Sequence, residues 1–257
     1  MERRKFLAAS FAASALALRA DEKGREHYEL RRYQLEAGAQ RKLTESYLHQ
    51  ALAPALNRLG IGPVGVFSVS IGLESAALYV LMPCLSVETL VGARFRLEQD
   101  EEYLKAGAAF INAPASQPAY QRVESSLLVA FEGWPKLTPP RATSEHRSRV
   151  FELRTYESPS DQDHKRKVEM FHSGEFDIFD KAGFWQIFYG DMLIGSRLPN
   201  LTYMLGFENM IEREKKWDAF RSAPAWKKLS ASPKFAYESI VSNVDNVILT
   251  PTSYSQI

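Results

Sequence analysis

Two stretches of the chain alternate between hydrophobic and polar residues in nearly the same way. The first is HYELRRYQ at residues 27–34, and the second is VFELRTYE at residues 150–157. A period of two residues is typical of a β-strand whose two faces differ. We therefore predict strands at residues 28–35 and 150–157, with Glu, Arg and Tyr on one face of both.

Each predicted strand is followed by hydrophobic residues at helical spacing. Gly60 and Gly183 come directly after the last of these positions, where a left-handed helix end favours glycine. Alternating runs with turn residues between them then predict a hairpin in each half, followed by a second helix and a last strand. In the first half, strands are predicted at residues 64–71, 76–82 and 124–131, with a helix near 87–107 before the last strand. In the second half, strands are predicted at residues 185–192, 201–207 and 241–249, with a helix at 212–220 before the last strand.

The two halves are related by a constant offset without a gap. The offset is 151 − 28 = 123 residues, from Tyr28 and Phe151, and it also places Gly60 on Gly183. We interpret residues 27–137 and 149–257 as two copies of one unit. The intervening segment, residues 138–148, contains two prolines and several charges and is predicted to be a solvated linker.

The order strand–helix–strand–strand–helix–strand predicts the ferredoxin-like arrangement for each copy, and so an α+β fold of two tandem βαββαβ repeats. One such unit leaves one face of its sheet uncovered. Two units in the same chain cover these faces by packing sheet against sheet, with the helices outside.

Composition narrows the classes of function. The 257 residues are 45% hydrophobic and 25% charged, as in an ordinary globular protein, and the formal net charge is only +1. A near-zero charge argues against a nucleic-acid partner. Cys84 is the only cysteine, which excludes an intramolecular disulfide and a cysteine zinc site. No metal-binding, phosphate-binding or nucleophile motif is found, so neither a metal nor a cofactor is expected.

The first twenty residues differ from the rest. MERRKFLAASFAASALALRA has basic residues, an alanine-rich apolar run and small residues, the layout of a twin-arginine-like export signal. We predict that residues 1–20 direct export to the periplasm or beyond. No later run is long and apolar enough for a transmembrane segment.

The Glu–Arg–Tyr face of the repeated strand is the first candidate ligand site. We expect the more apolar face to lie under the helices, so that Glu, Arg and Tyr point into the space between the sheets. Arginine there would recognise a carboxylate or phosphate, and tyrosine would offer a hydroxyl. Alternatively, Glu and Arg pair across that space and fix how the halves dock. The candidate residues are Glu29, Arg31 and Tyr33 with Glu152, Arg154 and Tyr156.

A second candidate lies on the helix of the second copy. His172 aligns with His49, and Glu175 follows three residues later on a hydrophobic stripe. Burial would raise the pKa of Glu175 and make the pair an acid or base. The alternative is a surface histidine beside a glutamate at the edge of the stripe. Tyr203, among the aromatic residues of the second hairpin, belongs to the core or lines an apolar pocket.

Several longer motifs follow one another in the second half. They are RTYESP (154–159), MFHSGEFDIFDKAGFWQIFYG (170–190), LPNLTYMLGF (198–207), WDAFRSAPAWKKLS (217–230) and VSNVDNVILTPTSYSQI (241–257). In these motifs and their order, the second half resembles the NIPSNAP family. The resemblance is weaker in the first half, which shares only the strand and the helix–glycine–hairpin framework. It implies a fold of the dimeric α/β-barrel type and no defined reaction; relatives by fold include cofactor-free monooxygenases and isomerases.

Three hypotheses of function stay open, and whether the protein is an enzyme stays open with them. The first is an exported, non-catalytic binder of a small apolar or amphipathic molecule, or of a protein partner. The second is a cofactor-independent monooxygenase or isomerase that uses the polar groups named above. The third is a structural or assembly protein, in which the tail at residues 251–257 makes contacts and a homo-oligomer forms.

Overall fold

The computed structural model describes residues 24–72 and 76–257. The predicted export signal at residues 1–20 lies outside the described residues. Within the described part, no helix combines the length and apolar character needed to cross a bilayer.

The elements of the two halves follow the same order. The first half contains β1 (His27–Gln34), α2 (Ala39–Tyr47), the π-helical turn η1 (Leu48–Leu52), α3 (Ala53–Arg58), β2 (Gly65–Ile71), β3 (Leu78–Cys84), α4 (Val87–Leu97), α5 (Glu101–Ala106), α6 (Ala108–Ile111) and β4 (Arg122–Ala130). After α7 (Arg141–Ser144), the second half contains β5 (Val150–Glu157), α8 (Asp161–Met170), the π-helical turn η2 (Phe171–Glu175), α9 (Phe176–Lys181), β6 (Trp185–Ile194), β7 (Asn200–Phe207), α10 (Met210–Ser222), α11 (Pro224–Ser230), η3 (Pro233–Phe235), α12 (Tyr237–Ile240) and β8 (Asn243–Pro251).

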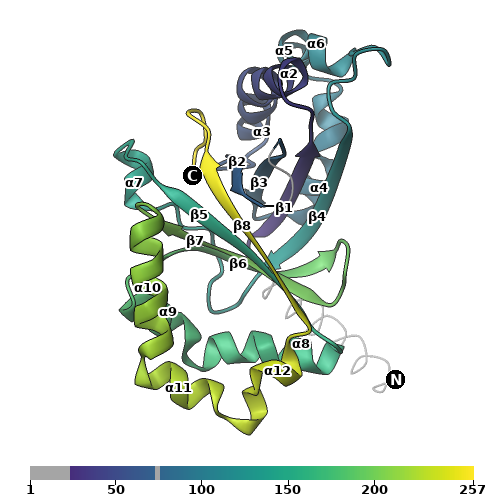
Figure 1. Cartoon of the computed structure of the whole chain (residues 1–257). Coiled ribbons are helices and arrows are strands. Elements are labelled where there is room, and N and C mark those ends of the chain that lie inside the picture. Colours follow the sequence, from purple (N-terminus) through teal and green to yellow (C-terminus); the bar gives the residue numbers. More distant parts are fainter. Residues whose placement is uncertain (1–23, 73–75) are drawn as a thin grey trace, which may run out of the picture.

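The eight named strands form one closed antiparallel barrel in the order β1-β3-β2-β8-β5-β7-β6-β4. Each half contributes four neighbouring strands, and the pairs β2–β8 and β4–β6 join the halves. The helices lie outside the barrel, those of the first half on one side and α8 to α12 on the other (Figure 1). A closed barrel leaves no free sheet edge, so every one of these strands is paired on both sides.

The offset of 123 residues holds for the elements themselves. It relates the bounds of β1 to those of β5, of η1 to η2, and of α3 to α9. Every predicted strand lies within two residues of an observed strand at both ends. The single helix predicted near residues 87–107 is wrong, because Asp100 interrupts it. The Asp100 side chain accepts a hydrogen bond from the backbone N–H of Tyr103 and so starts α5 as a separate helix.

The predicted orientation of the repeated strand is also wrong. Tyr28 and Phe151 are fully buried in the core cluster inside the barrel, so this face points inward. Tyr33 and Tyr156 belong instead to two separate clusters, each packed beneath the helices of its own half. The apolar residues Tyr28 and Phe151 pack in the barrel core, which leaves Glu, Arg and Tyr to meet the helices.

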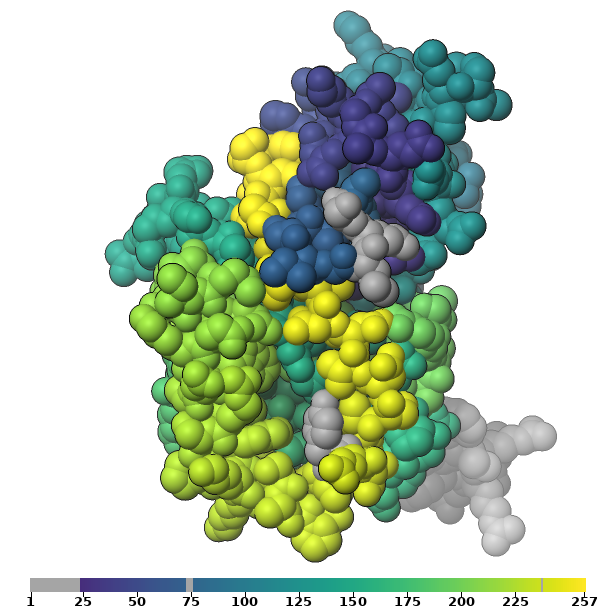
Figure 2. Space-filling view, in the orientation of Figure 1, coloured from purple at the N-terminus to yellow at the C-terminus, as the bar shows by residue number. Residues whose placement is uncertain are grey.

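The C-terminal tail fastens the two halves together. Figure 2 shows the yellow C-terminal segment running against the blue atoms of the first half. The ring of Tyr254 stacks on His49 with 4.5 Å between centroids, and Gln256 accepts a hydrogen bond of 2.7 Å from the backbone N–H of Val64. Ile257 is fully buried. The tail that we considered for contacts with other molecules therefore packs on its own chain.

Candidate functional site

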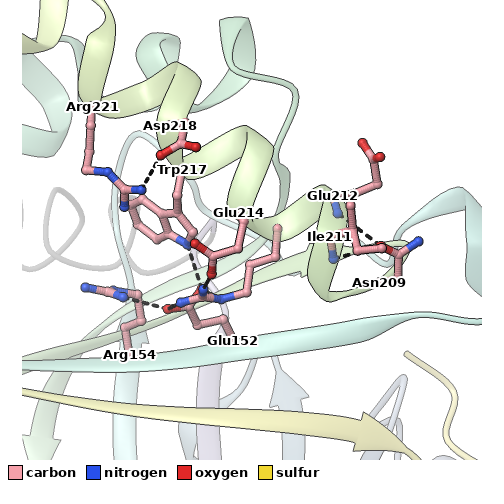
Figure 3. A network of polar contacts seen from close by, with 10 residues as sticks. Glu152, Arg154, Asn209, Ile211, Glu212, Glu214, Trp217, Asp218 and Arg221 are labelled. Atoms are coloured by element: carbon pink, nitrogen blue, oxygen red, sulfur yellow. Dashed lines mark hydrogen bonds and ion pairs between the residues drawn. The ribbon is translucent and has the colours of Figure 1, made fainter.

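The Glu–Arg–Tyr face of β5 meets α10 in a closed polar centre. Glu152 is fully buried, and both of its carboxylate oxygens are occupied. Oε1 accepts from Arg154 Nη1 (2.6 Å) and from Arg213 Nη2 (2.8 Å). Oε2 accepts from Arg213 Nε and from Trp217 Nε1, each at 2.8 Å (Figure 3). Burial alone opposes ionisation, but these donors and the charge of Arg154 hold the pKa of Glu152 below its usual range.

The centre continues along the strand. The Arg154 guanidinium donates to the Tyr156 hydroxyl at 3.0 Å, and its central carbon lies 4.7 Å from the centroid of the Trp217 ring. The Tyr203 hydroxyl donates to Tyr156 at 3.0 Å. Glu and Arg do pair, but within one strand and with their own helix. The prediction that they pair across the space between the halves is therefore wrong.

The same face of β1 carries the same three residue types with fewer partners. Glu29 Oε1 accepts from Arg31 Nη2 and Ser125 Oγ, both at 2.6 Å, and Arg31 Nη1 donates to the Tyr33 hydroxyl at 3.2 Å. Among the described residues, no protein group donates a hydrogen bond to Glu29 Oε2. Glu29 keeps 15% of its side-chain surface and Arg31 keeps 24%, so this centre is open where its counterpart is closed.

The difference originates in the second helix of each half. Applying the offset, Leu90 of α4 takes the place of Arg213 (213 − 90 = 123), and Arg94 takes the place of Trp217 (217 − 94 = 123). The Arg94 side chain is 81% exposed and pairs with Glu98 on its own helix instead of entering the structure. Among the described residues of the first half, nothing equivalent to the two α10 side chains therefore covers the Glu–Arg–Tyr face.

A cavity of about 630 Å³ occupies the space above this face. Glu29, Arg31, Tyr33 and Ser125 form its polar floor on β1 and β4. Its walls come from the helices and are mainly apolar and aromatic: Leu52, Leu56, Leu90, Leu97, Tyr103 and Phe110. A largely apolar pocket of this size with a few convergent polar groups is the usual form of a small-molecule site. We call it the first-half pocket.

A second cavity, of about 900 Å³, opens at one end of the barrel. The sequence predicted a cavity between the two sheets, and one is present, but the opposite strand faces line it. Leu30 and Leu153 contribute apolar surface. Its charged rim includes Arg32, which pairs with Glu124 at 2.7 Å. We call this cavity the barrel mouth.

His172 and Glu175 do not form the predicted pair. His172 is exposed; its Nε2 accepts from the backbone N–H of Gly133 (3.0 Å), and its Nδ1 donates to the Val168 carbonyl (2.9 Å). Glu175 is buried, with Oε2 2.7 Å from Lys167 Nζ. Burial raises the pKa of Glu175, as predicted, and the charge of Lys167 opposes this shift. Both side chains make structural contacts with other residues, and they do not form an acid–base pair with each other.

The sequence analysis did not identify Lys167 and Arg213, and it predicted burial of Trp217 without its hydrogen bond to Glu152. Lys167 lies two helical turns before Glu175, a spacing that places both on one side of the helix. Arg213 and Trp217 stand where the offset puts Leu90 and Arg94, so a comparison of the second helices would have found them. Among residues 24–72 and 76–257, no group of three or more His, Cys, Asp or Glu side chains is arranged to hold a metal ion.

Comparisons with known proteins bear on the family of the second half and on the fold. The sequence model of the NIPSNAP family matches residues 151–256, which confirms the resemblance of the second half. A search of curated protein sequences found no match. A NIPSNAP-like domain protein from Burkholderia xenovorans is 20% identical, with 42% of this chain and 88% of that chain covered and a TM-score of 0.38.

Two solved structures are similar over most of the chain. One is a putative monooxygenase from Fusobacterium nucleatum, 7% identical over 89% of this chain and 93% of that one, with a TM-score of 0.56. The other is a putative monooxygenase from Lactobacillus acidophilus, 8% identical over 88% and 94%, with a TM-score of 0.57. At such low identity the likeness establishes the barrel fold alone.

Proposed function

Because residues 151–256 form a NIPSNAP-family domain whose own Glu–Arg–Tyr centre is closed, we propose that binding takes place in the first half. The protein is then a non-catalytic binder of a small amphipathic molecule. One observation carries this proposal: Glu29, Arg31 and Tyr33 border a cavity of about 630 Å³ with mainly apolar walls.

The chemistry of the first-half pocket favours holding a molecule over transforming it. Apolar walls contribute affinity in proportion to the surface they remove from water, roughly 25 cal/mol per Å². The Arg31 guanidinium is already shared between Glu29 and Tyr33. Burial raises the pKa of Tyr33, with Arg31 opposing the shift, so its hydroxyl keeps its proton at neutral pH. These groups orient a ligand without supplying a strong base.

The proposal is tested with N-phenyl-1-naphthylamine, a neutral apolar probe that fluoresces when it leaves water. We expect it to bind the wild-type protein with one site. The variant Ala93→Trp, whose new ring would fill the first-half pocket, should abolish this binding.

The control is Val247→Trp, which places the same ring in the barrel mouth. It should leave probe binding intact. If Val247→Trp abolishes binding and Ala93→Trp does not, the site is the barrel mouth. If the folded wild type does not bind the probe, the proposed function fails. Circular dichroism establishes that each variant is folded.

A cofactor-independent monooxygenase is the second candidate, favoured by the likeness of the fold to two putative monooxygenases. Such an enzyme would consume O₂ with an aromatic substrate held in the first-half pocket. Oxygen uptake with a panel of phenols measures this directly. Uptake by the wild type that is lost in Tyr33→Phe would replace the binding hypothesis with this one.

We further interpret the two halves as tandem ferredoxin-like repeats. The interpretation is supported by the shared strand orders β4-β1-β3-β2 and β8-β5-β7-β6, and by the offset of 123 residues. Export through a twin-arginine-like signal is also a proposal, based on the sequence of residues 1–20. N-terminal sequencing of the protein recovered from a bacterial periplasm tests it; a form that keeps residue 1 and stays in the cytoplasm would refute it.

A further inference from the structure

We infer that the first-half pocket takes a flat aromatic molecule bearing a cationic N–H donor, such as an aryl amine, amidine or guanidine. This inference rests on the proposed function and adds the chemical class of the ligand. Its basis is that, in the second half, a guanidinium group and an aromatic N–H donor of the protein itself lie against the carboxylate that corresponds to Glu29.

The equivalence of the two places is structural as well as sequential. β1 and β5 have bounds that differ by 123 residues, and so do the starts of α4 and α10, at Val87 and Met210. Both helices begin in the same way, because Ser86 and Asn209, again 123 apart, accept hydrogen bonds from the first backbone N–H groups. The two helices therefore cross corresponding parts of the two sheets.

In the second half, α10 places a cation and an aromatic N–H donor on the buried carboxylate. Arg213 donates two hydrogen bonds to Glu152, and the Trp217 indole N–H donates a third (Figure 3). The indole ring also stacks over the Arg154 guanidinium. Together these side chains fill the space between the strand and its helix.

In the first half, the same space is the cavity. Leu90 cannot reach Glu29 with a charge, and Arg94 is turned outward to Glu98. The carboxylate oxygen Oε2 of Glu29 receives no hydrogen bond from the described residues, whereas the matching oxygen of Glu152 receives two. A ligand of the first half would thus fill the place that the Arg213 guanidinium and the Trp217 indole occupy in the second half.

The charges around Glu29 favour a positively charged ligand. Glu152 pairs with both Arg154 and Arg213, of which Arg213 also pairs with the exposed Glu214. Among the described residues, Glu29 pairs with Arg31 alone. A ligand cation beside Oε2 would give Glu29 the second cationic partner that Glu152 has in Arg213. Arg94 and Glu98 at the rim neutralise each other. A ligand carboxylate would instead meet Glu29 while Arg31 is already engaged, so like charges would oppose its binding.

The test compares two probes with the same ring and opposite charges. Tryptamine and indole-3-propionate are titrated into the full-length protein at neutral pH by calorimetry. Because a hydrogen bond to a charged group contributes about 1.5–3 kcal/mol, we expect tryptamine to bind at least about tenfold more tightly. In Glu29→Gln this preference should fall to within about threefold. The control Glu124→Gln makes the same change in the barrel mouth and should keep the preference.

Two results overturn the inference: indole-3-propionate binding as tightly as tryptamine, or a preference that survives in Glu29→Gln. The naphthylamine probe separates this failure from failure of the proposed function. If Ala93→Trp abolishes naphthylamine binding but the wild type binds tryptamine no more tightly than indole-3-propionate, the pocket is the binding site and the inferred ligand class is wrong. Retained naphthylamine binding by Glu29→Gln shows that the variant is folded.

Discussion

The two halves of this protein build the same frame and treat its Glu–Arg–Tyr face in opposite ways. In the second half, Glu152 has no exposed surface and four hydrogen bonds from three side chains. In the first half, Glu29 remains 15% exposed at the floor of a cavity. Two helix positions separate these outcomes. The same arrangement of strands and helices can thus form either a closed ion-pair centre or a binding pocket.

The contrast extends to the cores beneath the helices. The offset replaces Lys167 and Glu175 by Thr44 and Leu52, so the first half has no counterpart of that buried ion pair. It also replaces Tyr203 by Val80. The core beneath the helices of the second half contains more aromatic rings and a buried ion pair, and that of the first half contains more aliphatic side chains.

The largest expected effect is on the stability of the closed centre. Glu152→Gln leaves the Arg154 guanidinium without its carboxylate partner and Arg213 with only the exposed Glu214. It should lower the free energy of unfolding by about 4 kcal/mol. The matched change Glu29→Gln should lower it by about 1 kcal/mol, because that pair is partly exposed. Urea denaturation measures both. Equal losses would mean that the two centres do not differ in kind.

A smaller effect is expected when the buried pair of the second half is exchanged for the residues of the first. Glu175→Leu alone strands the Lys167 charge and should lower the free energy of unfolding by about 3 kcal/mol. The double variant K167T/E175L should recover most of this loss. A double variant as unstable as the single one would show that the Lys167–Glu175 pair stabilises the fold beyond neutralising its own two charges.

The pH dependence should also distinguish the centres. The pKa of Glu152 is lowered in the folded state, so its contribution is present above its ordinary value of 4.5 and is lost as the pH falls through the folded value. The wild type should therefore lose more stability than Glu152→Gln between about pH 6 and about pH 3. Parallel acid-denaturation curves for the two proteins would contradict this assignment.

The smallest effect is predicted for His172. Its ring bridges Gly133 and Val168, so His172→Ala should lower the free energy of unfolding by about 1 kcal/mol. Probe binding in the first-half pocket should be unchanged, since the histidine lies in the other half. A loss of binding without a loss of stability would return His172 to the list of functional candidates.

Much of the fold could be predicted from the sequence, because alternation and helical spacing locate elements and the offset exposes the repetition. The orientation of β1 and β5 could not. Both faces of these strands are covered, one by the barrel interior and one by helices, so alternation shows that the faces differ without showing which is inside. Glu29, Arg31 and Tyr33 were named as site residues, but their pocket depends on what α4 lacks, and a missing side chain leaves no motif.

The most direct test of this account rebuilds the second-half arrangement in the first half. The double variant L90R/R94W places arginine and tryptophan at the α4 positions that correspond to Arg213 and Trp217. Calorimetric titration with tryptamine should show binding to the wild type and none to the variant, whose folded state is established by circular dichroism. A folded variant that binds tryptamine as tightly as the wild type would contradict the claim that this pocket is the site.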